Sequence, residues 1–308
     1  MTLLTSDAKG VFVIAVTPFT PQGEIDFDSL DRVVDFYFEK GADGLTILGM
    51  MGEAPKLTQA ESRAVADRVI RRAEGKPVVV GVSAPGLAAI GELGKAVMDM
   101  GAAGVMATTP GSLKTDPQIH AYFGQVARVL GDDVPIVLQD FPLATGVQIS
   151  GDVLASIIDD VEQVVMLKHE DWPGLEKITR IRADEANGRR RISVLCGNGG
   201  VFLPEEMARG ADGAMTGFGF PEMLADIVRL GAAGDMDRAH DVFGAYLPLV
   251  RYEQQPGAGL AVRKYVLAQR GAIISPALRV PGAGLTALAM AEVDRLLARQ
   301  ETRLKELN

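Results

Sequence analysis

The chain has 308 residues, of which 47% are hydrophobic and 23% are charged, and this composition excludes disordered, collagen-like and coiled-coil proteins. Its 31 basic and 40 acidic residues give a net charge of −9 without any Lys/Arg-rich run, so we expect no nucleic-acid or membrane partner. The length fits a single α/β barrel with a large core.

The few cysteines and histidines limit the metal and redox chemistry that we expect. Cys196 is the single cysteine, which excludes an internal disulfide and any multi-cysteine metal site. His120, His169 and His240 lie far apart and form no HExxH motif, so we expect no metal, although a site made of carboxylates alone stays open. Residues 1–13 lack the pattern of a signal peptide, and no apolar segment reaches membrane-spanning length. These features predict a cytoplasmic protein.

Eight short runs rich in β-branched residues alternate with longer segments of helical periodicity. Because the runs are apolar on both faces, they are typical of buried parallel strands. The runs are Val11–Val16, Gly44–Leu48, Pro77–Gly81, Gly104–Ala107, Pro135–Leu138, Val164–Leu167, Ser193–Cys196 and Ala214–Met215. Successive runs start 21 to 33 residues apart, about one βαβ unit each, so the sequence predicts an α/β protein with a (β/α)8 TIM barrel.

A doubly wound open sheet would show the same alternation of strands and helices. Such a sheet commonly carries a glycine-rich dinucleotide loop after its first strand, but the segment Val16–Phe19 follows here. The barrel is therefore the favoured architecture. Beyond the eighth strand the chain is rich in helix, at Asp237–Val250, Gly259–Arg270 and Leu285–Leu304. We expect residues 1–220 to form the barrel, and residues 221–308 to form its last helix and a C-terminal helical extension of the same structural unit.

Lys168 is the most unusual residue for its place in the predicted barrel, because it directly follows the apolar run Val164–Leu167. The active sites of such barrels lie at the C-terminal ends of the strands. Burial there disfavours the charged form of a lysine and leaves a neutral amine, which can condense with a ketone. An equally good interpretation from this pattern alone is that Lys168 merely extends to solvent.

Other candidate groups follow the predicted strand ends. Because the side chains of a strand alternate between its two faces, we expect Glu170 on the same side as Lys168, where it can move protons. Alternatively, it is a solvated acid beside Asp171. His169 faces the other way and is expected to pack. Gln139 and Asp140 end the fifth strand, where they orient substrate hydroxyls or simply begin a turn set by Pro142. The loop after the second strand comprises Gly49, Met50, Met51 and Gly52. Its glycines allow backbone N–H groups to approach a carboxylate closely, or the loop is a plain turn.

The loops after strands seven and eight, Gly197–Gly200 and Thr216–Pro221, leave room for a ligand. Neither is a Walker loop, because no Gly-Lys-Ser/Thr follows, which disfavours phosphate transfer. The segment Gly81–Pro85 comes nearest to a GxSxG nucleophile elbow but lacks the final glycine. The sequence therefore offers no nucleophile motif that would support a hydrolase.

Taken together, these positions resemble the dihydrodipicolinate synthase/N-acetylneuraminate lyase family over nearly the whole chain. The matching segments in family order are Gly10–Phe19, Gly49–Glu53, Lys168 and Arg279–Pro281. The resemblance implies a (β/α)8 barrel, commonly a homotetramer, that needs no cofactor because a lysine forms an iminium with pyruvate or another 2-oxo acid. It makes Lys168 the Schiff-base residue and the backbone of Met50 and Met51 the carboxylate cradle.

The sequence departs from the synthase of this family at several site positions. Gln139 replaces a tyrosine at the end of the fifth strand, and Met50 and Met51 replace hydroxyl side chains of the carboxylate loop. A second tyrosine is replaced in the Gly111-Ser112 region, and the substrate-binding arginine aligns with the Leu143-Ala144 stretch. A semialdehyde with its own charged groups would therefore lose a partner.

The changed positions are more similar to the 2-keto-3-deoxy-L-arabonate dehydratase branch, although the Gly49–Gly52 loop does not match it closely. The similar segments are Gln139-Asp140, the Lys-x-Glu arrangement at 168–170, Gly213–Gly217, and Leu247–Leu249 with Glu253. The prediction is therefore a Schiff-base lyase that dehydrates a 2-keto-3-deoxy sugar acid. A pyruvate-dependent aldolase or a synthase-type condensation is the alternative, and a non-catalytic 2-oxo acid binding protein is the alternative of another class.

The predicted site contains two groups of residues. The catalytic group is Lys168, Glu170 and Gln139. The substrate-binding group is Gly49, Met50, Met51, Gly52, Asn198, Met215 and Thr216. The expected partners are a small 2-oxo acid and further copies of the chain, as a dimer or tetramer, with no metal.

Overall fold

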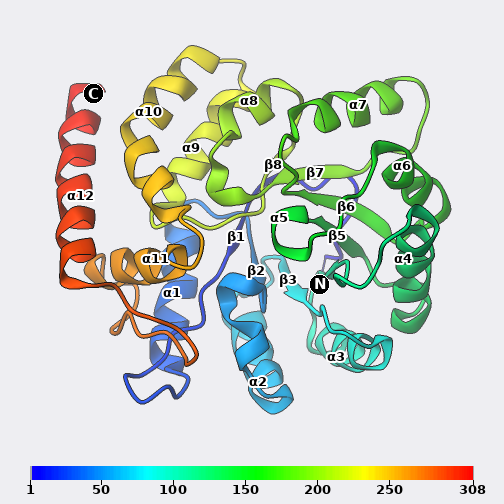
Figure 1. Ribbon diagram of the computed structural model, residues 1–308, viewed down its shortest axis with the longest axis horizontal. Helices are drawn as coiled ribbons and strands as arrows, with labels where there is room; N and C mark the ends of the chain where they lie inside the picture. Colours follow the sequence, from blue (N-terminus) through cyan, green and yellow to red (C-terminus); the bar gives the residue numbers. More distant parts are fainter. Residues whose placement is uncertain (1, 308) are drawn as a thin grey trace.

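The computed structural model describes residues 2–307 and shows eight parallel strands that close into a barrel in chain order, each followed by helix (Figure 1). This confirms the predicted (β/α)8 fold. The strands are β1 Gly10–Ile14, β2 Gly44–Ile47, β3 Val78–Gly81, β4 Gly104–Thr108, β5 Ile136–Asp140, β6 Val164–His169, β7 Ser193–Cys196 and β8 Gly213–Ala214.

Both faces of the strands are buried, as their continuous apolar runs predict. Alternate side chains fill the barrel interior, and they include Phe12, Val79, Met106, Met166 and Leu195. The intervening side chains point outward and pack against the helices as the main core. The strands therefore need no polar face, and the polar side chains at their C-terminal ends stand out against an apolar interior.

The helices surround the barrel and cover its outer face (Figure 1). Local sequence fixes several helix starts: Asp26 accepts a hydrogen bond from the Ser29 amide at 2.9 Å, and Thr58 forms a capping box with Glu61. The helices of the barrel are α1 Phe27–Glu39, α2 Gln59–Arg72, α3 Leu87–Met100, α4 Asp116–Leu130, α5 Pro142–Thr145, α6 Gly151–Asp160, α7 Leu175–Ala186, α8 Leu203–Ala208 and α9 Pro221–Ala232.

The boundaries differ from the predicted ones where strand pairing outweighs local composition. β5 and β6 extend to Asp140 and His169, because the ladder pairs Gln139 with Lys168 and Asp140 with His169. Lys168 therefore lies within β6 rather than after it. Short turns of helix that carry no periodicity were not predicted: α5, η1 Met50–Gly52, η2 Ala54–Lys56 and η3 Asn198–Gly200.

Three C-terminal helices follow the barrel: α10 Met236–Glu253, α11 Gly259–Gln269 and α12 Ala287–Leu307. They agree with the predicted helices within a few residues. α12 lies along the outer side of α10 at one edge of the molecule (Figure 1). Within residues 2–307, no helix combines the length and apolar character that crossing a membrane requires.

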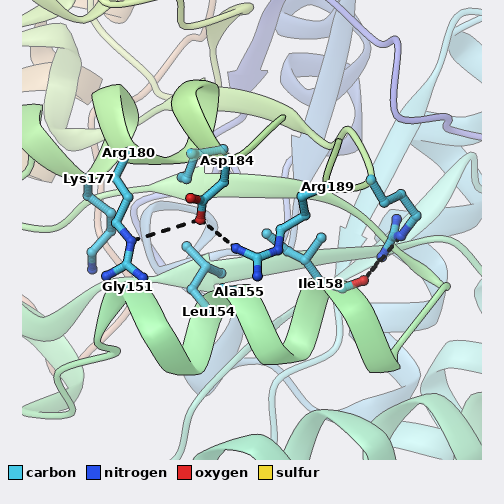
Figure 2. A pocket seen from close by; sticks show the side chains of 10 residues that line it. Gly151, Leu154, Ala155, Ile158, Lys177, Arg180, Asp184 and Arg189 are labelled. Carbon is cyan, nitrogen blue, oxygen red and sulfur yellow. Dashed lines mark hydrogen bonds and ion pairs between the residues drawn. The ribbon is translucent and has the colours of Figure 1, made fainter. Parts of the chain in front are cut away.

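A shallow hollow lies between α6 and α7 on the outer layer of the barrel (Figure 2). Asp184 pairs there with Arg189 at 2.5 Å and lies 3.9 Å from Arg180, so these charges largely neutralise one another. The hollow measures about 10 Å³, which is about the space of one water molecule. It is therefore too small for a substrate.

The main core predicts a large penalty for truncating a buried aromatic residue. Phe123 on α4 is fully buried, so Phe123→Ala should lower the free energy of unfolding by about 3–5 kcal/mol. Phe27 at the start of α1 is 36% exposed, and Phe27→Ala should cost less than about 1 kcal/mol. Urea unfolding followed by circular dichroism measures both variants, and equal losses would contradict this description of the core.

Candidate active site

A cavity of about 490 Å³ lies at the C-terminal ends of the strands. Its wall is formed by strand ends, by the loops after β2, β7 and β8, and by the connection between α10 and α11. Lys168, Glu170 and Gln139 line it together, although Gln139 is 31 residues from Glu170 in sequence. The closed barrel thus brings the three predicted catalytic side chains to one place.

The three side chains are in direct contact. Lys168 Nζ lies 3.0 Å from Glu170 Oε2, and Gln139 Nε2 donates a hydrogen bond to the same oxygen at 2.7 Å. Lys168 is 5% exposed and Glu170 is 6% exposed, so neither is the solvated surface group of the alternative interpretation. An amine, a carboxylate and an amide donor, all three largely buried, therefore meet at the wall of the cavity.

The loop after β7 fixes the other oxygen of Glu170. The Asn198 amide lies 3.4 Å from Glu170 Oε1, and Asn198 Nδ2 donates to the Glu170 carbonyl at 3.1 Å. A Cβ atom at Gly197 would lie only 2.2 Å from Glu170 Cγ, so glycine is required for this close approach. Thr216 accepts from the Gly199 amide at 2.8 Å, which joins this loop to the loop after β8.

The predicted carboxylate loop lies at the opposite wall. Met50 and Met51 line the cavity, and their amides lie in the first turn of η1, where backbone N–H groups lack helical partners. Gly49 instead lines a neighbouring hollow of about 600 Å³ that shares Met50, Gln139 and Ala144 with the cavity. Gly52 is buried, and its carbonyl accepts a hydrogen bond from Thr17 Oγ1 at 2.7 Å.

Met215 does not line the cavity. Its side chain is fully buried in the barrel interior together with Met166 and Leu195. β8 ends at Ala214, and beyond it Thr216 and Gly217 reach the cavity instead. The side chain of Met215 thus supports the floor of the site from below.

Glu53 holds the carboxylate loop to the C-terminal part of the chain. Its carboxylate accepts from Lys264 Nζ at 2.6 Å, from Lys56 Nζ at 2.7 Å and from the Arg279 amide at 3.1 Å. Burial lowers the pKa of Lys264 to about 8, although Glu53 opposes this shift. Glu53 itself has a left-handed φ of 55° and is almost fully buried, so the end of η1 has little freedom.

A second group of buried charges lies behind β5 and β6, outside the barrel. Lys177 Nζ lies 2.6 Å from both Asp140 Oδ2 and Asp171 Oδ2. Burial raises the pKa of Asp140 to about 6 against the effect of Lys177. His169 is buried and does not line the cavity, and burial lowers its pKa to about 4. His169 is thus neutral at neutral pH, as a packing residue would be.

Four buried or cavity-lining residues were not predicted from the sequence: Trp172, Lys177, Glu206 and Arg263. Arg263 and Trp172 line the cavity, and Glu253 contacts Arg263 there at 2.6 Å. A signal for Arg263 existed, since Arg263 and Lys264 interrupt the otherwise apolar buried face of α11. Among residues 2–307, no cluster of three or more His, Cys, Asp or Glu side chains is arranged to hold a metal ion.

The model of the dihydrodipicolinate synthetase family matches residues 7–300. The chain belongs to this family. Members of the dihydrodipicolinate synthetase family are lysine Schiff-base lyases, and the chain is an enzyme of this class.

Individual relatives within the dihydrodipicolinate synthetase family carry different activities in their names. The L-2-keto-3-deoxyarabonate dehydratase of Azospirillum brasilense is 30% identical over 282 residues, which cover 89% of this chain and 88% of that protein. The 4-hydroxy-tetrahydrodipicolinate synthase of Sorangium cellulosum is 33% identical over 309 residues, covering 95% and 97%. A crystal structure named dihydrodipicolinate synthase, from Rhodopseudomonas palustris, has a TM-score of 0.96 at 56% identity and covers 97% of this chain and 100% of that one.

Glu206 on α8 is a buried carboxyl group whose titration changes the stability of the fold with pH. Burial raises its pKa from 4.5 to about 8, with further upward contributions from Glu205 and Glu170, while Cys196 lowers it. The folded state therefore keeps a proton that the unfolded chain loses above pH 4.5, so this group makes stability fall as the pH rises from 4.5 to 8.

Glu206→Gln should remove this contribution, because the amide does not titrate. We expect the difference in unfolding free energy between the variant and the wild type to grow in favour of the variant from pH 4.5 to 8. Urea unfolding at several pH values measures it, with the exposed Glu176→Gln as the control. A constant difference over this range would show that Glu206 is not a buried neutral acid.

Proposed function

We propose that the chain dehydrates a 2-keto-3-deoxy sugar acid through an iminium on Lys168. The observation that carries this proposal is the 3.0 Å contact between Lys168 Nζ and Glu170 Oε2 inside the cavity, with Gln139 donating to the same carboxylate. A nucleophilic amine and a proton acceptor on one substrate are what this chemistry requires.

In the proposed first stage, the ammonium proton of Lys168 passes to Glu170, and the neutral amine attacks C2 of the substrate. In the carbinolamine that forms, the nitrogen passes one proton to the C2 oxygen and Glu170 returns the other, so that this oxygen leaves as water and the iminium is complete. The iminium acidifies the C3 proton, and Glu170 is the acceptor, so that an enamine forms. Gln139 orients Glu170 throughout through its 2.7 Å hydrogen bond.

In the second stage the enamine expels the C4 hydroxyl, which takes the proton from Glu170 and leaves as water. A conjugated iminium remains, and its hydrolysis releases the dehydrated 2-oxo acid and regenerates Lys168. The substrate carboxylate is assigned to the free amides of Met50 and Met51. Asn198 and Thr216 then border the chain beyond C3.

Charge in the cavity favours dehydration over synthase-type condensation. Two of the charged side chains that line it, Lys168 and Glu170, pair with each other, and the remaining two, Glu253 and Arg263, do the same. The Leu143-Ala144 stretch aligns with the substrate-binding arginine of the synthase, so the charged groups of a semialdehyde find no spare cation among the residues that line the cavity. The relationship to the A. brasilense dehydratase supports the same choice.

Condensation with pyruvate, or aldol cleavage, is the second candidate, because the R. palustris protein that is 56% identical is named a synthase. All three reactions share the iminium and differ in products. A homo-oligomer stays a prediction, since one solved relative at 25% identity is described as a monomeric variant.

Lys168→Ala tests the covalent step. Wild-type protein treated with borohydride and pyruvate should gain the mass of a reduced adduct on Lys168, whereas the variant should gain none. Mass spectrometry of the intact protein and of its peptides measures this, with circular dichroism to verify the fold. A wild-type protein without an adduct would overturn the proposal and favour a non-catalytic binding protein.

Glu170→Gln tests the proton transfers that are assigned to this carboxylate. Removal of a general base should lower turnover of a 2-keto-3-deoxy acid by about 10²- to 10⁴-fold, while the pyruvate adduct forms more slowly but still accumulates on prolonged incubation, because water replaces Glu170 in the transfers to and from the amine. Product analysis by mass spectrometry identifies the reaction: a product lighter than the substrate by one water supports dehydration, and pyruvate with an aldehyde supports cleavage. Glu176→Gln is the matched control, because Glu176 lies on the surface of α7.

A further inference from the structure

Arg263 on α11 is a buried cation at the wall of the cavity. It is 2% exposed, and its Nε donates to Glu253 Oε1 at 2.7 Å while its Nη2 donates to the Gly217 carbonyl. Within residues 2–307, its Nη1 has no hydrogen-bond partner. A buried charged donor without a partner is costly and calls for an acceptor that binds there.

The loop after β8 is shaped to admit this guanidinium. A Cβ atom at Gly217 would lie 2.3 Å from Arg263 Nη1, so any other residue would displace it. Gly217 and Arg263 both line the cavity, and Nη1 is buried directly against Gly217, at the part of the wall that this glycine forms. Glu253 Oε2 accepts from the Gly219 amide at 3.2 Å, so both partners of the ion pair are fixed to the same loop.

The net charge of the Arg263–Glu253 ion pair indicates what kind of ligand group Nη1 binds. Glu253 already neutralises Arg263 at 2.6 Å, so the pair carries no net charge. A neutral oxygen therefore suits Nη1 better than a second carboxylate does. In the proposed mechanism the substrate carboxylate lies at Met50 and Met51 and C2 lies on Lys168, so the groups that remain are the hydroxyls beyond C3.

We propose that Arg263 is a specificity-determining residue that donates from Nη1 to a hydroxyl on the chain of the substrate beyond C3. This inference rests on the proposed function, because the placement of the carboxylate and of C2 comes from it. The active site then selects hydroxylated 2-oxo acids over short or unsubstituted ones. An acid without the hydroxyl leaves a buried donor unpaired, and a charged donor of this kind is worth roughly 10- to 100-fold in affinity.

The test compares three acids: a five-carbon 2-keto-3-deoxy acid, 2-oxopentanoate, which lacks its hydroxyls, and pyruvate. Calorimetry in a Lys168→Ala background measures binding without turnover. We expect this protein to bind the hydroxylated acid roughly 10- to 100-fold more tightly than 2-oxopentanoate. Adding Arg263→Lys, which keeps the charge opposite Glu253, should reduce this preference to less than about threefold.

Arg182→Lys is the matched control, because Arg182 is ion-paired with Asp212 at the other end of the barrel. It should keep the full preference. Equal loss of affinity for all three acids in the Arg263 variant would overturn the inference and assign the arginine to the carboxylate or to the fold. The inference would also be overturned if the Lys168→Ala protein, with Arg263 intact, showed no preference for the hydroxylated acid or bound none of the acids. This outcome does not depend on whether the Arg263 variant folds.

Different measurements test the Schiff-base function of Lys168 and the hydrogen bond from Arg263. Calorimetry in the Lys168→Ala background measures the effect of a hydrogen bond from Arg263 to the hydroxyl, whereas borohydride trapping on the wild type measures the covalent step. A missing adduct with an intact preference would count against the Schiff-base function alone. An adduct without a preference would count against Arg263 alone.

Discussion

Parallel pairing of β5 with β6 places Gln139 opposite Lys168, and closure of the barrel turns both side chains into the same cavity. Glu170 follows two residues later on the same side and meets both. Buried charges are tolerated only when they are paired and hydrogen-bonded, and this contact supplies both conditions. A shift of one residue in the β5–β6 register would send Lys168 into the helix layer.

Two groups of buried ion pairs hold this arrangement from outside the barrel. Lys177 joins Asp140 to Asp171, which are the direct neighbours of Gln139 and Glu170 in sequence. Glu53 joins the loop after β2 to α11 and to the segment that contains Arg279. Alternate residues of one strand thus serve the cavity and its support, so the site and the fold depend on the same few segments.

The sequence predicts the parts of the site that local periodicity controls. Eight apolar runs at regular spacing predict the barrel, and a period of two predicts that Lys168 and Glu170 share a side. The direction of the Met215 side chain could not be predicted in this way, because β8 spans only two residues and the alternation of side chains beyond it cannot be followed from the sequence. Arg263 shows another limit, since its contacts with Glu253 and Gly217 join segments that only tertiary packing brings together.

The chemistry proposed for Lys168 and Glu170 depends most directly on removal of a proton from C3 of a bound 2-oxo acid. Exchange of the pyruvate methyl protons in D2O, followed by proton NMR, measures this step alone. The wild type should exchange these protons, Lys168→Ala should not, and Glu170→Gln should exchange them about 10²- to 10⁴-fold more slowly. Exchange by Glu170→Gln at the wild-type rate, or no exchange by a wild type that forms the adduct, would contradict the account.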